Sequence, residues 1–405
     1  MLKNVLSYGF IQKIAVLYIV IWTVSPPLQV DTIYRLLALG CAVIWVALWF
    51  VRENPISLGK EQIGAIIFLV CVMVVIYIEK YEIENLIKQI ALIMLVMCFL
   101  MTYFYDDKWK ELYGIVPIVL ILLTIFNYKT FNLLIEDHTV ARLLVRDSEE
   151  TYNFLRQGIG GYSLIYPQVC ISPLIVAWTF KSFKNNKLFF AIGIVWAYTF
   201  IRLIELAGYS IALFASSVGL LLLIFYRGKN AIAAFIIAIL VFAAIMASIL
   251  YIPSFREWIL ETFDGTAVAR KVNDLISTSD SGVTGDSIQV RITAYTDSLG
   301  DMIRYPVIGS LWRDSGGGHS AVLDTFSKYG WLGGYALVMM FYHVPFHYKH
   351  HYNNKFILST ANATLITMMF VSVLDSFNYS FTCMILIVSS LMFEDIVKWT
   401  GAEKT

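Results

Sequence analysis

Long apolar runs recur along the whole chain, and they constrain its fold more than any other feature of the sequence. Each run is roughly 18 to 23 residues long, which is the length that an α-helix needs to cross the hydrocarbon core of a bilayer. Only 15% of the residues are charged, against about 25% in a typical soluble protein. The sequence therefore predicts an all-α polytopic membrane protein, and a net charge of +1 gives no basis for a nucleic-acid-binding surface.

Twelve of these runs qualify as membrane spans, and residues 1–405 are predicted to form one integral membrane domain. The spans are expected near residues 9–27, 33–51, 62–79, 88–105, 112–130, 161–180, 187–202, 208–226, 230–252, 330–347, 355–374 and 379–397. Most Lys and Arg residues of the short connections fall on one side of this arrangement. Because basic residues are enriched on the cytoplasmic side, we expect both termini in the cytoplasm.

Two connections between the predicted spans are long, and this topology places both on the outer side. The first loop covers residues 131–160 and carries Arg142, Arg146 and Arg156, and the second covers residues 253–329. A guanidinium group is always charged, and its planar set of donors matches phosphate oxygens. The arginines of the two loops therefore favour an anionic ligand at the outer surface. The alternative is that each arginine pairs with acidic residues of its own loop.

The second loop is expected to contain short helices. Residues 255–263 place their apolar side chains on one helical face, so this segment lies either in the membrane interface or on the outer surface of the protein itself. A longer helix is predicted to begin near Ile288 and to end before Pro306. It carries Arg291 and Tyr295 one helical turn apart. We expect both side chains to take part in binding.

The end of the second loop combines cations with a glycine turn. His319 follows three consecutive glycines and precedes a predicted helix that enters the membrane. Such a turn directs backbone N–H groups and the histidine toward one point, which suits an anion. The further candidates for binding in this stretch are Arg304, Arg313, Gly317, Gly318 and Ser320.

The remaining polar candidates lie at the ends of predicted spans. Asp375 lies at the outer end of a span, where it is a further candidate to line the site. Four histidines cluster at a predicted cytoplasmic end without a carboxylate or a cysteine beside them, so we expect no metal site there. They are His343, His347, His350 and His351.

The two outer loops share a weak internal pattern. Arg146 is followed by Gly158 in a Gly-Ile-Gly-Gly sequence, and Arg304 is followed at the same spacing by Gly316 in Gly-Gly-Gly-His. Each sequence leads directly into an apolar segment. One interpretation is a chance coincidence. The other is that each loop presents an arginine and a glycine turn to the same ligand.

The stretch 291–333 resembles the family of bacterial O-antigen polymerases and O-antigen ligases. The ligase-type pattern is a histidine, then Asn, Ser or Gln, nine residues, a glycine, two residues, and Gly, Thr or Tyr. Here it is matched by His319, Ser320, Gly330 and Gly333. Upstream, Arg291 and the Pro-Val-Ile-Gly sequence that follows it resemble the arginine and the proline–glycine turn of that family.

The resemblance implies a GT-C-like membrane glycosyltransferase that acts on the outer face of the cytoplasmic membrane. The donor and the acceptor would be glycans carried on undecaprenyl diphosphate, with no metal and no other cofactor. Arg291 and His319 would be the catalytic residues. The diphosphate would be bound by the other arginines together with Tyr295, Gly317, Gly318 and Ser320. A chain-length regulator and a flippase would be further protein partners beside the lipid bilayer.

The reaction implied first is polymerisation of lipid-linked oligosaccharide repeat units into a surface polysaccharide, because arginines occur in both outer loops. An O-antigen ligase, which transfers the glycan to lipid A core, shares the same pattern and is the first alternative. A flippase or another transporter is the second alternative. Transporters usually have two similar halves and polar groups at the midplane of the membrane, whereas the polar residues of this chain lie mainly in the loops.

Overall fold

The computed structural model describes residues 8–52, 60–79, 112, 114–137, 140–144, 148–225, 231–264, 269, 272, 273, 276, 286–310, 318–376 and 379–402. Regular secondary structure in this part of the chain is helical, without a β-strand. The predicted all-α class is therefore confirmed. The predicted span 88–105 lies outside the described residues, as do Arg146, Arg313 and Gly317.

Four described helices are long and apolar enough to cross a membrane, as expected for a membrane protein. They are α7 (Ile115–Glu136), α10 (Tyr162–Asn185), α11 (Lys187–Ala207) and α18 (Lys355–Leu374). A fifth span results if α13 (Ala231–Tyr251) and α14 (Pro253–Thr262), which meet at a bend of 97°, count as one. The prediction of twelve spans concerns the whole chain, whereas this number covers only the described residues, in which the further apolar helical segments are Phe10–Val24, Thr32–Leu48 and Ile211–Phe225.

The other described helices agree closely with the apolar and amphipathic segments of the sequence. The apolar ones are α2 (Tyr8–Val24), α4 (Thr32–Arg52), α5 (Lys60–Glu79), α12 (Ser210–Phe225) and α19 (Tyr379–Thr400). The short ones are α3 (Pro26–Val30), α8 (Val140–Leu143) and α9 (Glu149–Arg156), and the loop helix and its successor are α16 (Asp286–Arg304) and α17 (Ala321–His351). Pro306 follows α16, so the predicted end of that helix is confirmed.

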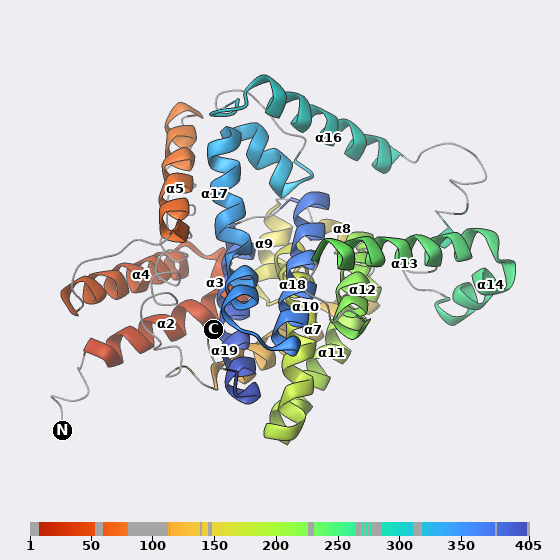
Figure 1. Ribbon diagram of the computed structural model, residues 1–405, viewed down its shortest axis with the longest axis horizontal. Coiled ribbons are helices and arrows are strands. Elements are labelled where there is room, and N and C mark those ends of the chain that lie inside the picture. The colour runs from red at the N-terminus through yellow and green to blue at the C-terminus, as the bar shows by residue number, and fades with distance from the viewer. Residues whose placement is uncertain are drawn as a thin grey trace.

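Helix α10 lies at the centre of the bundle, where it contacts α11, α12, α18 and α19 (Figure 1). Its side chains are buried along most of its length. Polar groups at this depth need partners inside the protein. Asn127 of α7 and Gln168 of α10 exchange two amide hydrogen bonds of 2.9 Å, and the Trp196 indole donates to Gln168 at 2.8 Å. This network joins three helices.

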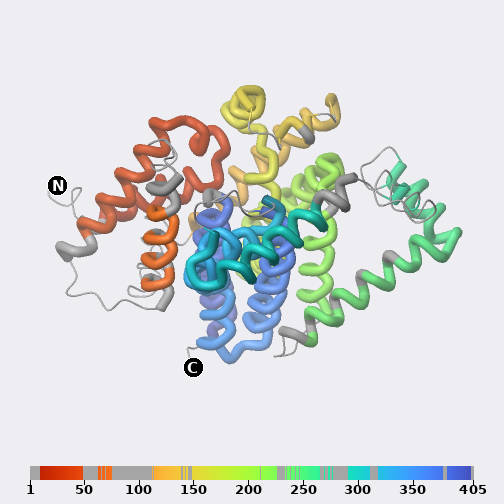
Figure 2. The backbone as a smooth tube through the Cα atoms, turned by 90° about the horizontal axis from the view of Figure 1, so that it is seen from above, coloured from red at the N-terminus to blue at the C-terminus, as the bar shows by residue number. Residues whose placement is uncertain are grey.

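The remaining helices are arranged around this centre. Helices α2, α4 and α5 lie on one side of it, and α13 with α14 project from the opposite side (Figure 2). Helix α16 lies across the beginning of α17 (Figure 1), and the two helices are in contact. Of the α16 side chains that the structure describes, Ala294 and Ser298 are buried, on the face that packs against α17. Helix α16 of the second loop therefore covers one end of the bundle.

Helix α17 is broken at Gly330, which has a φ of 66° and a ψ of −166°. The loop at 306–310 crosses the chain at this break. The N–H of Trp331 donates to the carbonyl of Pro306 at 2.7 Å, and the N–H of Ser310 donates to the carbonyl of Ser327 at 2.9 Å. A Cβ atom on Gly330 would lie only 2.4 Å from the carbonyl oxygen of Val307. The first segment of α17 is thus held at an angle by a backbone crossing that only glycine permits.

Candidate functional site

The ends of α17 and α18 meet and form the base of the candidate site. The N–H of Ala321, the first residue of α17, donates to the carbonyl of Asp375, which caps α18, at 2.9 Å. Ser320 caps α17 by accepting from the N–H of Leu323 at 3.1 Å, as its position before an apolar helix favours. Its hydroxyl also donates to the carbonyl of Ser372 at 3.4 Å. Ser320 therefore fixes the start of α17 against α18.

Helix α16 adds a cation to this junction. The guanidinium of Arg291 donates to the carbonyl of Leu374 at 3.0 Å, and the hydroxyl of Tyr295 donates to the same oxygen at 2.9 Å. One turn further, the hydroxyl of Ser298 donates to Asp324 of α17 at 2.7 Å. Residues 291, 295 and 298 share one face of a helix, so one surface of α16 makes all three contacts.

Asp375 is the most deeply buried acid of the site, with 3% of its surface exposed. One carboxylate oxygen accepts from the N–H of Ser376 at 2.9 Å. The other, Oδ2, is buried and has no hydrogen-bond partner among the described residues. Burial raises the pKa of the Asp375 carboxyl, and the Tyr166 hydroxyl, the Ser376 N–H and the charges of Arg291 and His319 each lower it in part. Both predicted catalytic residues thus act electrostatically on this one carboxyl group.

Three tyrosines form a further wall of the site: Tyr162 and Tyr166 from the beginning of α10, and Tyr209 directly before α12. Tyr162 and Tyr209 meet edge to face with ring centroids 4.6 Å apart, and Tyr166 stacks on Tyr209 at 6.1 Å. The Tyr166 hydroxyl lies close enough to Asp375 to influence its pKa. These tyrosines come from segments more than a hundred residues before Asp375 in the sequence. The site therefore joins five parts of the chain.

The glycine turn of the first loop ends beside these tyrosines. The N–H of Gly160 donates to the Thr130 hydroxyl at 2.9 Å, and a Cβ atom on Gly161 would lie 2.5 Å from the carbonyl oxygen of Leu144. The turn leads directly into Tyr162. His319 lies at the same site, but Gly316 and Gly317, like Arg146, are outside the described residues, so the shared role of the two glycine sequences stays a prediction.

The structure brings together several of the residues that the sequence singled out. Arg291, Tyr295, His319 and Ser320 surround the junction of α17 and α18, and Gly318, with a φ of 70°, directly precedes the histidine. His319 is partly exposed, whereas Ser320 is buried. Asp375 completes this group, which we call the junction site.

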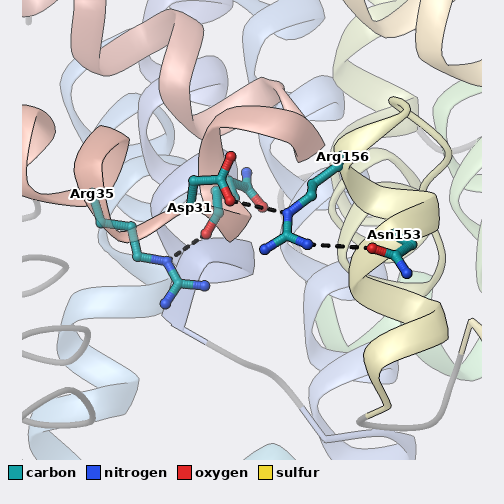
Figure 3. Close-up of polar contacts among 5 residues, drawn as sticks. Asp31, Arg35, Asn153 and Arg156 are labelled. Carbon is teal, nitrogen blue, oxygen red and sulfur yellow. Dashed lines mark hydrogen bonds and ion pairs between the residues drawn. The ribbon is translucent and has the colours of Figure 1, made fainter.

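Two other predicted binding residues lie elsewhere. Arg304 is exposed at the end of α16. Arg156 of α9 forms an ion pair of 3.1 Å with Asp31, next to Asn153 and Arg35 (Figure 3). Its guanidinium is therefore engaged in joining α9 to the turn between α3 and α4. Arg142 belongs to α8, but its side chain is outside the described part of the structure, as are Arg146 and Arg313.

Two cavities adjoin the broken helix α17. The smaller, of about 70 Å³, is lined by residues of both helix ends, including Ala321 and Ser372, and by Phe68 of α5. The larger is an apolar groove of about 620 Å³ between α5 and α17, covered at one end by Pro306 and Val307. Ile67 and Ala336 line the groove, and their neighbours Phe68 and Leu337 line the small cavity. Cavities thus lie beside the junction site, at Ala321 and Ser372, and between α5 and α17.

Among the residues that are described, the arrangement offers charge stabilisation and proton transfer. Among them, no group of three or more His, Cys, Asp or Glu side chains is placed to hold a metal ion. Comparison of the chain with protein-family models, with curated proteins and with solved structures found no match.

Proposed function

We propose that this protein polymerises oligosaccharide repeat units carried on undecaprenyl diphosphate, with the junction site as its active site on the outer face of the membrane. The observation that carries the proposal is the convergence of Arg291, His319 and the buried carboxyl of Asp375 beside an apolar cavity. The resemblance of residues 291–333 to O-antigen polymerases and ligases points to Arg291 and His319 independently of their placement in space.

Arg291 and His319 would stabilise the leaving group. Transfer of a glycan from its lipid carrier releases a polyprenyl diphosphate, so negative charge develops on the bridging oxygen as the bond to the sugar breaks. Arg291 can donate two parallel hydrogen bonds to phosphate oxygens, and it now donates to an uncharged carbonyl, that of Leu374. A diphosphate is the stronger acceptor, so Arg291 would exchange this carbonyl for the substrate when it binds.

Asp375 would accept the proton of the attacking hydroxyl. The acceptor oxygen forms the new bond to the anomeric carbon, the bond from that carbon to the diphosphate breaks, and the hydroxyl proton passes to Asp375 Oδ2. A base with a raised pKa is better suited to this role than an ordinary aspartate. Assigning the proton to Asp375 leaves His319 to bind the diphosphate.

The apolar groove between α5 and α17 would hold the polyprenyl chain. It is lined almost entirely by apolar side chains, such as Ile63, Leu332 and Met339, and it adjoins the small cavity at Ser372. A lipid tail in this groove would leave its diphosphate near the junction site. The low density of charge inside the described spans disfavours the alternative of a transporter.

The proposal is tested by expressing the wild type and variants in a host that lacks its own polymerase but supplies the lipid-linked repeat unit. We expect the wild type to restore a ladder of glycan lengths on a gel, and Arg291→Ala and His319→Ala to abolish it at equal protein level. Arg304→Ala, which removes an exposed arginine of the same helix, is the matched control and should keep the ladder.

Two outcomes would contradict the proposal and favour one of its alternatives. Transfer of preformed chains to lipid A core with unchanged length distribution would identify an O-antigen ligase, which uses the same site with a different acceptor. Full activity of both the Arg291 and the His319 variants would exclude the junction site as the active centre. A flippase would then be the leading alternative.

A further inference from the structure

A second polar site lies at the opposite end of the same central helices. Helices α10 and α18 run in opposite directions along the bundle. The first residues of α10 and the last residue of α18 meet at the junction site, so the end of α10 and the beginning of α18 meet at the other end of the bundle. Helices of 24 and 20 residues separate the two ends by roughly 30 Å.

A pocket of about 310 Å³ occupies this end and combines cations with aromatic rings. Lys181, Lys184 and Asn185 come from the end of α10, Phe356 from the beginning of α18, and Trp399 from the end of α19. The Lys181 ammonium lies 4.6 Å from the centre of the Phe356 ring. Among the described residues, no carboxylate forms an ion pair with Lys181 or Lys184. Two positive charges therefore face the pocket without an acidic partner.

The surface beside the lysines is apolar. Phe180 also lines the pocket and is 66% exposed, and Phe183 and Leu188 are exposed next to it. A water-facing surface would rarely carry three such side chains together, whereas a bilayer would cover them. The positive end of the α18 dipole lies at the same place, because Phe356 is the second residue of that helix. Cations and a hydrocarbon-facing surface thus adjoin one another.

We propose that this pocket binds the headgroup of an anionic phospholipid. The phosphate would lie between Lys181 and Lys184, Trp399 would lie at the level of the headgroups, as tryptophan does at membrane interfaces, and the acyl chains would extend over Phe180 and Phe183. A soluble anion would use the lysines but would gain nothing from the exposed phenylalanines. The proposal is independent of the glycosyl transfer assigned to the junction site.

The test uses the purified full-length protein in detergent and counts bound lipid by native mass spectrometry. We expect one tightly bound dioleoylphosphatidylglycerol, and binding of dioleoylphosphatidylcholine at least tenfold weaker. The double variant Lys181→Gln/Lys184→Gln should lose roughly 10- to 30-fold in affinity for phosphatidylglycerol, since each lysine near a membrane surface contributes on the order of a fivefold effect. The matched control is Lys187→Gln/Lys349→Gln, which removes two charges that do not line the pocket and should bind as the wild type does.

Equal binding of the two lipids, or unchanged binding by the double variant, would overturn the proposal. Displacement of phosphatidylglycerol by millimolar inorganic phosphate would show instead a site for soluble anions. If the double variant does not fold, Lys184→Gln alone serves, because that side chain is exposed and its loss cannot disturb the core. A decrease in affinity of about fivefold is then expected, and no decrease would contradict the proposal.

Discussion

Two buried aspartates, Asp395 and Asp375, differ in the hydrogen-bond partners of their carboxylate oxygens. Asp395 of α19 is 5% exposed, and its Oδ2 accepts a hydrogen bond of 2.9 Å from the indole of Trp178 in α10. Asp375 is 3% exposed, yet its Oδ2 has no hydrogen-bond partner among the described residues, and Arg291 and His319 lie close to it. A buried polar group that is satisfied joins helices, whereas one left unsatisfied beside cations is expected to serve a reaction.

The largest expected effect is the difference in activity between the Asp375→Asn and Asp395→Asn variants. Asp375→Asn removes the proposed proton acceptor, so we expect polymerisation to fall by about 10²- to 10⁴-fold. The unfolding temperature should stay the same or rise, because an ionised carboxyl no longer has to be buried. Asp395→Asn keeps an oxygen that can accept from Trp178 and should retain activity. The measurements are glycan chain formation and thermal unfolding of the same preparations.

Loss of stability in the Asp375→Asn variant, in parallel with its loss of activity, would contradict this distinction. Asp375 would then be a structural residue like Asp395.

The pH dependence of activity is a second test of the difference between Asp375 and Asp395. The base must be ionised to accept a proton, and burial raises the pKa of Asp375 above its ordinary value of 3.8. Activity should therefore fall as the pH decreases through this raised pKa, at a higher pH than an exposed aspartate would give. The free energy of unfolding changes with pH in the opposite direction to activity. A raised pKa in the folded state stabilises the folded protein at low pH, and this contribution is lost as the pH rises through the folded pKa.

The measurement is the initial rate against pH for the wild type and Asp395→Asn, which should superimpose. The free energy of unfolding of Asp375→Asn, measured against pH, should lack the decrease that the wild type shows as the pH rises through the raised pKa of Asp375. If activity decreases only near the ordinary pKa of an exposed aspartate, burial does not raise the pKa of the catalytic base, and this would contradict the role of Asp375.

The next effect concerns the backbone crossing that holds α17 at the junction site. Gly330→Ala would place a Cβ atom 2.4 Å from the Val307 carbonyl oxygen, at a positive φ that disfavours any side chain. We expect a loss of about 2 to 4 kcal/mol in the free energy of unfolding, with lower activity because Ser320 and His319 move. The control is Gly300→Ala in α16, where nothing lies within 4 Å and helix propensity should add roughly 0.5 to 1 kcal/mol.

Equal stability of the two glycine variants, measured by chemical or thermal unfolding, would show that the crossing does not hold α17 in place.

The sequence predicted the junction site in part, and helical geometry explains which part. Arg291 and Tyr295 are one turn apart and lie on the same face of α16, whereas Arg304 is thirteen residues from Arg291 and is rotated by roughly 220° around the helix. The helical period alone could have placed Arg304 on the far side. Gly330 and Gly333 were visible as a pattern, but their reason, a crossing with the loop at 306–310, depends on a contact between separate segments.

Other features of the site had no local signal. Tyr166 and Tyr209 reach Asp375 only because α10, α12 and α18 pack together, and nothing in the neighbouring sequence marks them. Asp375 itself was visible as an acid at the end of an apolar run. Its burial and its unpaired oxygen depend on the ends of α16 and α17 covering it, which no periodicity predicts.

The smallest effect is expected at Arg156, which the sequence could not distinguish from Arg291. Arg156 and its partner Asp31 are 52% and 39% exposed, so solvent screens their attraction. Arg156→Ala should change the free energy of unfolding by less than about 1 kcal/mol and leave the glycan ladder intact. Arg291→Ala, at equal protein level, should abolish it. A loss of activity in Arg156→Ala with unchanged stability would mean that the first loop moves Arg156 toward the junction site when substrate binds, and the two arginines would then act on one ligand.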